Sequence, residues 1–139
     1  IEIGGEIRTK VTNYKHDWIV GIQNPLSNTI IKKVKLNNMS MATSGTYNNF
    51  FKINNKIYSH IINPKTGHPF DYKTISSTII AKDCIDADAY ATIALTMHPD
   101  EIINLFETDI SVEAYILEFD NDNIIEYKTS GFDKIETEN

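Results

Sequence analysis

The sequence has only one cysteine, Cys84, among its 139 residues, and a single thiol excludes an internal disulfide. No apolar run reaches the ~20 residues that a membrane-spanning helix needs, and no signal-peptide pattern is present. The four histidines stand at spacings that match no zinc motif, either with one another or with Cys84. These absences exclude a disulfide scaffold, a chain built of membrane-spanning helices and a zinc module.

Positive charge is also scarce, since 13 Lys and Arg stand against 19 Asp and Glu and give a net charge of −6. No basic cluster appears, which argues against nucleic acid and anionic membrane surfaces as partners. Residues 29–36 alternate apolar side chains with Lys32, Lys33 and Lys35, a pattern typical of a half-buried strand with a solvated face. A chain of this length forms one domain or less and buries about two-thirds of its unfolded surface.

The most informative stretch runs from residue 41 to residue 69. Residues 41–45 are small and hydroxylated and end in a glycine, as in a strand whose backbone must approach something closely. Two aromatic and β-branched runs follow, 47–53 and 56–62, and the Asn pair between them predicts a two-residue hairpin loop. The return strand is predicted to carry His60 near its end, before a turn over residues 63–67 that contains a proline and ends in a glycine. A hairpin that places a histidine next to a tight turn indicates a functional site.

The remaining segments predict an α+β fold, mostly antiparallel sheet with two adjacent helices. Strands are expected at 1–11 (around a glycine pair), 18–22, 29–36 and 74–81, with a closing hairpin at 112–119 and 124–128. The first helix is expected from the N-cap Asp83 to about residue 97, with Asp86 completing a capping-box-like arrangement. Pro99 suits the first turn of a second helix that ends near residue 107. The polar residues from Ser130 onward are expected to be frayed.

Two groups of side chains could carry chemistry. Asp88 and Thr92 are four residues apart on the expected helix, so they share one face and form an oxygen-only pair suited to Mg²⁺. The alternative is an acid that favours the helix dipole and a threonine bonded back to a carbonyl. His60 has a side chain suited to taking a proton from a hydroxyl near neutral pH, although a lone strand histidine is more often structural.

The small residues before the first hairpin strand also have two interpretations. Ser44 and Gly45, with Thr43 before them, could bind a phosphate or a flavin, or they could form a strand end chosen for small side chains. Spacing alone leaves these alternatives open.

Three strings in this order resemble the FAD:protein FMN transferases, the ApbE family: ATSGTYNNFF, YSHIINPKTGHP and DADAYAT. The initial IEIGGEIR is similar to the glycine pair of that family. One departure is Asn63, where the family usually has Asp; we interpret that position as turn-making, which Asn performs equally well.

The resemblance implies a fold and a set of site residues. The chain, residues 1–139, would be a single-domain fragment, the C-terminal part of a larger ApbE-like, T-fold-related domain. Asp88 and Thr92 would hold Mg²⁺, His60 would be the catalytic base, and Ile62 would contact FAD through its backbone. The fragment alone would be inactive, because the family completes the metal and flavin sites from its N-terminal part.

The resemblance also implies a reaction and partners. The expected activity is Mg²⁺-dependent transfer of FMN from FAD to a threonine hydroxyl of a target flavoprotein, with release of AMP. Acceptors would be subunits of membrane electron-transfer complexes, and the complete protein would be exported or anchored facing the periplasm, with a homodimer as one assembly. Two alternatives stay open: hydrolysis of FAD to FMN and AMP, and a non-catalytic flavin-binding or assembly module.

Overall fold

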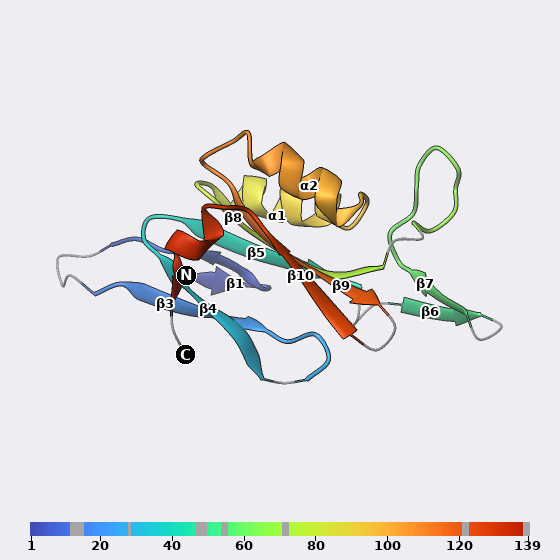
Figure 1. Cartoon of the computed structure of the whole chain (residues 1–139), viewed down its shortest axis with the longest axis horizontal. Helices are drawn as coiled ribbons and strands as arrows, with labels where there is room; N and C mark the ends of the chain where they lie inside the picture. The colour runs from blue at the N-terminus through green and yellow to red at the C-terminus, as the bar shows by residue number, and fades with distance from the viewer. Residues whose placement is uncertain are drawn as a thin grey trace.

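Three layers make up the molecule in the computed structural model, which describes residues 1–11, 16–27, 29–46, 50–53, 56–70, 73–120 and 123–137. A six-stranded antiparallel sheet forms the middle layer, two helices cover one of its faces and a three-stranded sheet covers the other (Figure 1). The predicted α+β class, mostly antiparallel with two adjacent helices, is confirmed. No helix in the described part of the chain is long and apolar enough to cross a membrane.

The strands pair in a fixed spatial order. The central sheet consists of β1 (Glu2–Ile3), β2 (Glu6–Arg8), β5 (Ser40–Gly45), β8 (Thr74–Ala81), β9 (Glu113–Asp120) and β10 (Asn123–Lys128). The second sheet consists of β11 (Glu136–Thr137), β4 (Ile30–Leu36) and β3 (Trp18–Gln23). A separate hairpin of β6 (Phe50–Ile53) and β7 (Lys56–Ser59) stands beyond one end of the sheet (Figure 1). The helices are α1 (Cys84–Ala94), α2 (Pro99–Phe106) and the short 3₁₀ helix η1 (Phe132–Lys134).

The face of the central sheet under α1 and α2, here called the helix side, has a core rich in small residues. Ala87, Ala91 and Ala94 of α1 are fully buried, so the helix backbone lies close to the strands below it. Alanine also has the highest helix propensity, which helps this segment to form a helix. The core is completed by Ala42, Ile79, Ala81, Ile102, Phe106, Val112, Ala114 and Ile116.

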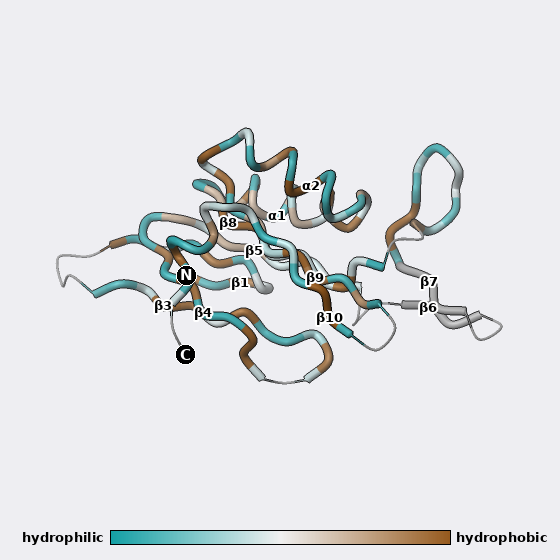
Figure 2. The backbone as a smooth tube through the Cα atoms, in the orientation of Figure 1, coloured by the Kyte–Doolittle hydropathy of each residue, from teal (hydrophilic) through white to brown (hydrophobic). Residues whose placement is uncertain are grey.

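The opposite face, here called the sheet side, packs larger side chains between the two sheets. Tyr115 and Phe132 are almost completely buried and stack with ring centroids 5.2 Å apart. Burial is the main cause that raises the pKa of the Tyr115 hydroxyl above its ordinary value. The rest of this core comprises Ile22, Val34, Leu36, Met41, Ile80 and Leu117. Figure 2 shows hydrophobic residues gathered in the paired strands, whereas the projecting loop after β7 is hydrophilic toward its tip.

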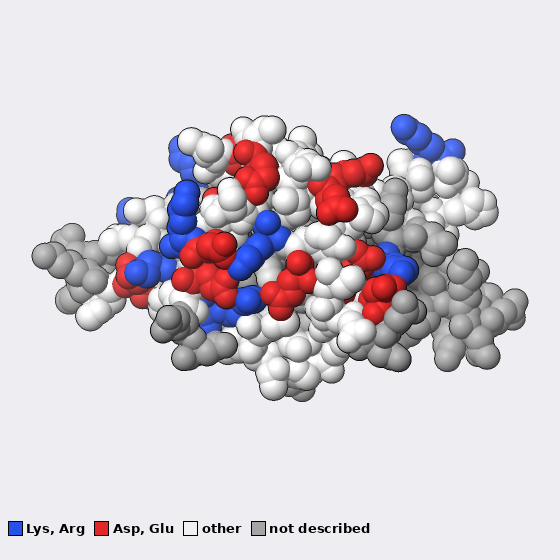
Figure 3. Space-filling model, in the orientation of Figure 1, with Lys and Arg blue, Asp and Glu red and all other residues white. Residues whose placement is uncertain are grey.

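The C-terminal segment is ordered, so the prediction of a frayed polar tail from Ser130 is wrong. Phe132 of η1 fills the sheet-side core, and β11 pairs with β4. Ion pairs strengthen the attachment: Lys32 contacts Glu136 at 3.0 Å and Glu126 at 3.3 Å, and Lys128 contacts Glu136 at 3.2 Å. Figure 3 shows acidic and basic side chains interleaved on the surface of the molecule where η1 and β10 lie in front.

Both helices begin where the sequence predicts, but their caps differ from the prediction. Asp83 occupies the N-cap of α1 without a side-chain capping hydrogen bond, so the capping-box-like arrangement with Asp86 is wrong. The capping box instead opens α2, where His98 accepts a hydrogen bond from the backbone of Asp100 and Glu101 accepts one from the backbone of His98. Helix α1 ends at Ala94, earlier than expected, because the chain must turn there to begin α2 at the predicted proline.

Two further boundaries correct the sequence analysis. The first expected strand is a hairpin, in which Gly4 (φ +70°) and Gly5 (φ +108°) make the turn between β1 and β2. Strand β7 ends at Ser59, so His60 follows the strand instead of belonging to it. The predicted strand residues 47–49, the hairpin loop at 54–55 and the turn residues 121–122 lie outside the described residues.

Candidate functional site

The exposed flank of α1 carries the two predicted metal ligands. Asp88 and Thr92 are both exposed and stand one helical turn apart. Their neighbours Ala87 and Ala91 are fully buried and hold the helix against the sheet. The small alanine side chains therefore keep this flank close to the strand beneath it.

The end of β5 meets this flank. Ser44 Oγ lies 3.3 Å from Thr92 Oγ1, a contact between residues 48 positions apart in the chain. The structure thereby joins the predicted cofactor-binding residue Ser44 to the predicted metal ligand Thr92. Sequence reasoning had placed these residues in separate motifs with no stated contact.

A third hydroxyl, missed by the sequence analysis, lies directly beside this pair. Ser77 of β8 is the cross-strand partner of Ser44, so both side chains point to the helix side. Ser77 is fully buried, and its Oγ has no hydrogen-bond partner within the described structure. A buried hydroxyl without a partner is costly, so Ser77 is free to bond a further polar group at this place. The hydroxyl-rich start of the 74–81 strand, read beside residues 43–45, was the available signal.

The donor set fits a hard cation. Asp88, Thr92 and Ser44 offer only oxygen atoms, which Mg²⁺ prefers. Within the described ranges, no three His, Cys, Asp or Glu side chains are grouped as a protein-enclosed metal centre would require. A cation on this flank would therefore keep several waters or take phosphate oxygens as its remaining ligands.

The other members of the 43–45 segment play different parts. Thr43 points to the opposite face of the sheet, where its Oγ1 lies 2.8 Å from Thr78 Oγ1. This contact makes Thr43 part of the strand pairing. Gly45 ends β5 opposite Ser76 and is half-buried, so it adds no side chain where the strand leaves the sheet.

His60 and Ile62 lie on the loop that follows β7, and both are exposed. An isolated bridge between Ile62 and Pro69 closes the base of this loop. The loop that carries these two predicted residues projects at one end of the central sheet (Figure 1). Their predicted roles as base and as flavin contact stay predictions.

The turn in this loop bears out the interpretation of Asn63. Its side-chain Oδ1 accepts a hydrogen bond from Lys65 N at 2.9 Å, and its carbonyl accepts one from Gly67 N at 2.8 Å. Gly67 has φ +72°, the left-handed conformation that glycine adopts without strain. The asparagine therefore performs the local turn-making that an aspartate would perform.

The fold is an α+β architecture in which an antiparallel sheet has hydroxyl and carboxylate side chains beside its covering helix, and sequence comparison identifies the family. Residues 1–116 match the model of the ApbE family, and the chain belongs to that family. It is 32% identical over 139 residues to the FAD:protein FMN transferase of Haemophilus influenzae and 33% identical over 135 residues to that of Vibrio cholerae. The matches cover 97% and 95% of this chain, and 40% of each relative. The chain thus spans about two-fifths of the length of these curated relatives.

Solved structures agree with this assignment. The ApbE protein of Thermotoga maritima is 27% identical and superimposes with a TM-score of 0.81 over 99% of this chain and 44% of its own. The apo flavinyl transferase ApbE of Pseudomonas stutzeri is also 27% identical, with a TM-score of 0.79 over 96% of this chain and 42% of its own. The arrangement of strands and helices described above is therefore that of this family.

Proposed function

We propose that these residues contribute the cation-binding flank and the base of a Mg²⁺-dependent transferase that moves FMN from FAD to a threonine hydroxyl of an acceptor protein. The observation that carries the proposal is the Ser44–Thr92 contact with Asp88 one turn away. The name FAD:protein FMN transferase, borne by the curated relatives, supports the reaction class. Because those relatives are more than twice as long, the activity is proposed for a protein of their full length that contains this chain.

Asp88 and Thr92 would hold the cation, with Ser44 and Gly45 at the edge of the same site toward the FAD pyrophosphate. When bound, Mg²⁺ would neutralise the charge that develops on the phosphate oxygens. The exposure of the Asp88 and Thr92 side chains leaves room for water and phosphate oxygens around the ion.

His60 would take the proton of the acceptor hydroxyl on an imidazole nitrogen. The threonine oxygen then forms a bond to the FMN phosphorus, the pyrophosphate P–O bond breaks and AMP leaves. An exposed position at the base of a projecting loop suits a base that must reach a group on another protein. Ile62, two residues on, would contact FAD through its backbone.

The acceptors would be flavoprotein subunits of membrane electron-transfer complexes. We propose the periplasmic side of the membrane as the site of action, through export or an anchor, and a homodimer as one assembly. These proposals rest on the resemblance of the three sequence motifs to the family.

The direct test is to incubate a protein of full relative length with FAD, Mg²⁺ and a candidate acceptor, and to weigh the acceptor. The expected result is a mass gain equal to one FMN less one water at a threonine, with AMP released. Release of FMN and AMP without acceptor labelling would indicate the hydrolase, and FAD binding without turnover would indicate the binding module. The 139-residue chain alone is expected to be inactive.

Substitution of His60 tests the base. His60→Asn should lower the transfer rate by ~10²–10⁴-fold while FAD still binds. Transfer at a nearly normal rate at pH 7 would show that His60 is a structural residue and not the base.

Substitution of Asp88 tests the metal site. FAD and Mg²⁺ should strengthen each other's binding in the wild type, because linkage between two ligands of one site is reciprocal. Asp88→Ala should lose this mutual effect and the activity together, and Thr92→Val should weaken it more mildly. An unchanged Mg²⁺ enhancement in Asp88→Ala, measured by calorimetry, would refute the assignment.

A further inference from the structure

We propose that Glu6 is a second carboxylate of the cation site, acting on the ion through one of its bound waters. This inference rests on the proposed function, since it concerns the same cation. It adds a residue from the glycine-turn hairpin at the start of the chain to a site otherwise built from β5 and α1.

Strand pairing places Glu6 on the helix side. In the antiparallel pairing of β2 with β5, Ile7 is opposite Met41 and Arg8 is opposite Ser40. Ile7 packs against the sheet-side core with Met41, so its neighbour Glu6 points to the other face. One step further along this register, Glu6 stands beside Ala42, which belongs to the helix-side core.

Two contacts fix how α1 lies above these strands. At its beginning, the Cys84 Sγ donates to the carbonyl of Ile7 at 3.4 Å, and toward its end Thr92 meets Ser44. The helix therefore runs along β5 from the start of this strand, where it pairs with β2, toward Ser44 at its end. Asp88 is midway between Cys84 and Thr92, about 6 Å along the axis from each, which brings it level with the Ala42–Glu6 pair.

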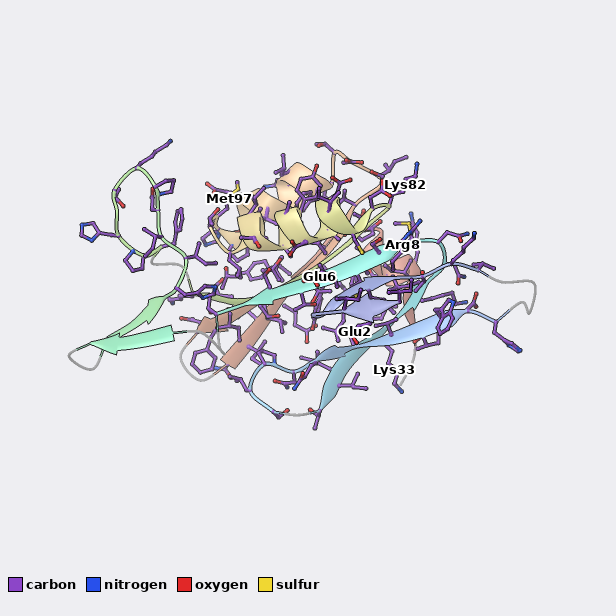
Figure 4. The ribbon with its side chains drawn as sticks, turned by 180° about the vertical axis from the view of Figure 1, so that it is seen from behind. Glu2, Glu6, Arg8, Lys33, Lys82 and Met97 are labelled. Carbon is purple, nitrogen blue, oxygen red and sulfur yellow. The ribbon has the colours of Figure 1, made fainter. Side chains whose placement is uncertain are left out.

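The Glu6 side chain is turned toward the same end of the sheet as Ser44. Its Oε2 lies 3.1 Å from the position that a Cβ on Gly4 would occupy, so the carboxylate folds back over the glycine turn. The positive φ values of Gly4 and Gly5 form this turn at the Ser44 end of the strand pair. In Figure 4, which views the molecule from behind, Glu6 is labelled on the side of β1 and β2 that faces α1, and Glu2 on the opposite side.

The negative charges of Glu6 and Asp88 are the reason to expect a cation between them. Within the described residues, neither Glu6 nor Asp88 is engaged in an ion pair or a side-chain hydrogen bond. Two carboxylates on one face repel each other, and a divalent cation between them converts that repulsion into attraction. Mg²⁺ gives up its waters reluctantly, so the half-buried Glu6 acts as an outer acceptor for a bound water.

Binding of Mn²⁺, a paramagnetic substitute for Mg²⁺, tests the inference without turnover. In a protein of full relative length, with and without FAD, electron paramagnetic resonance measures free Mn²⁺ and hence the dissociation constant. Glu6→Gln should weaken Mn²⁺ binding by about tenfold, the lower end of what outer-shell partners contribute. Glu2→Gln is the matched control, because Glu2 is opposite Ile7 in the same hairpin and so points to the other face. The Mn²⁺ affinity of Glu2→Gln should stay within about twofold of the wild type.

The outcomes distinguish the role of Glu6 from the existence of the metal site. A Glu6→Gln variant that binds Mn²⁺ as tightly as the wild type, while Asp88→Ala does not bind it, would overturn the role of Glu6 and leave the metal site intact. Normal Mn²⁺ binding by Asp88→Ala would instead refute the site itself. Thermal melts of each variant are the control for misfolding. Glu6→Gln is expected to fold normally, because Glu and Gln have the same shape and Glu6 lies near the sheet edge.

Discussion

The two faces of the central sheet differ in what they pack and in what they leave exposed. The helix side is filled with alanines, which bring α1 close to the strands and leave Asp88 and Thr92 on an open flank. The sheet side is filled with large side chains such as Tyr115 and Phe132 and is bordered by ion pairs. The proposed cation site therefore lies on the side with small buried side chains, and the large buried side chains lie on the other side. Substitutions on each side should separate these two properties.

The largest expected effect is on the sheet side. Phe132→Ala removes a fully buried ring that stacks on Tyr115, and it should lower the free energy of unfolding by about 3–5 kcal/mol. Urea denaturation measures this loss. Leu105→Ala, at a side chain of α2 that is 51% exposed, is the control and should cost about 1 kcal/mol or less. If Phe132→Ala stayed folded but lost Mn²⁺ binding, the separation between the two sides would fail.

The second prediction concerns the close approach of α1 to the sheet. Ala91 is fully buried, so Ala91→Leu would force the helix outward and should cost about 1–3 kcal/mol of stability. The same movement would separate Thr92 from Ser44 and weaken Mn²⁺ binding. Ile93→Leu on the exposed part of the helix is the control for both measurements. Unchanged Mn²⁺ affinity in a destabilised Ala91→Leu protein would show that the site tolerates this displacement.

A smaller effect is expected at Gly131, where the chain enters η1. A Cβ there would overlap the Glu113 carboxylate, which also accepts a hydrogen bond from Thr129. Gly131→Ala should therefore cost about 1–2 kcal/mol in the wild type. In a Glu113→Ala background the same change should be neutral or stabilising, because φ at Gly131 is an ordinary −76° and alanine restricts the unfolded chain. Equal costs in both backgrounds, measured by chemical denaturation, would contradict this explanation.

The smallest effect concerns acid stability. Lys32, followed by Lys128, lowers the pKa of Glu136 below its ordinary value. A carboxyl group with a lowered folded-state pKa stabilises the protein above its unfolded pKa, and this contribution is lost as the pH falls through the folded pKa. Glu136→Gln should therefore lose less stability than the wild type between about pH 6 and pH 3, by about 1 kcal/mol at most, since such pairs are weak. Parallel acid titration curves for the two proteins would show that the ion pairs contribute nothing measurable.

The sequence predicted the individual elements better than the contacts between them, and the reason lies in the range of the signals. The β-branched run of residues 74–81 and the proline at the start of α2 are local, so these elements were placed correctly. The four-residue spacing of Asp88 and Thr92 was likewise enough to set them on one exposed flank. Ser77 was missed because its place beside Ser44 depends on the register between β5 and β8, which no local pattern specifies.

The C-terminal segment was mispredicted for a related reason. Residues from Ser130 onward are mostly polar, and composition alone suggested a frayed end. One aromatic ring, Phe132, and the pairing of Glu136 with Val34 hold the segment in place. Both interactions depend on partners outside the segment, so neither leaves a periodic signal in the segment itself.

The pairing of β11 with β4 also has a consequence for the order in which the molecule folds. Glu136 and Val34 are more than a hundred positions apart, whereas α1 follows β8, the strand against which it packs, after only two residues. Contacts that close long loops form late, because the entropy of the loop is lost before the contact repays it. We therefore expect α1 to dock on the central sheet first and the sheet side to close last. We expect the apolar side chains around Val34 and Tyr115 to stay accessible to other chains until β11 and Phe132 pack over them, so that the C-terminal segment protects the folding molecule from aggregation.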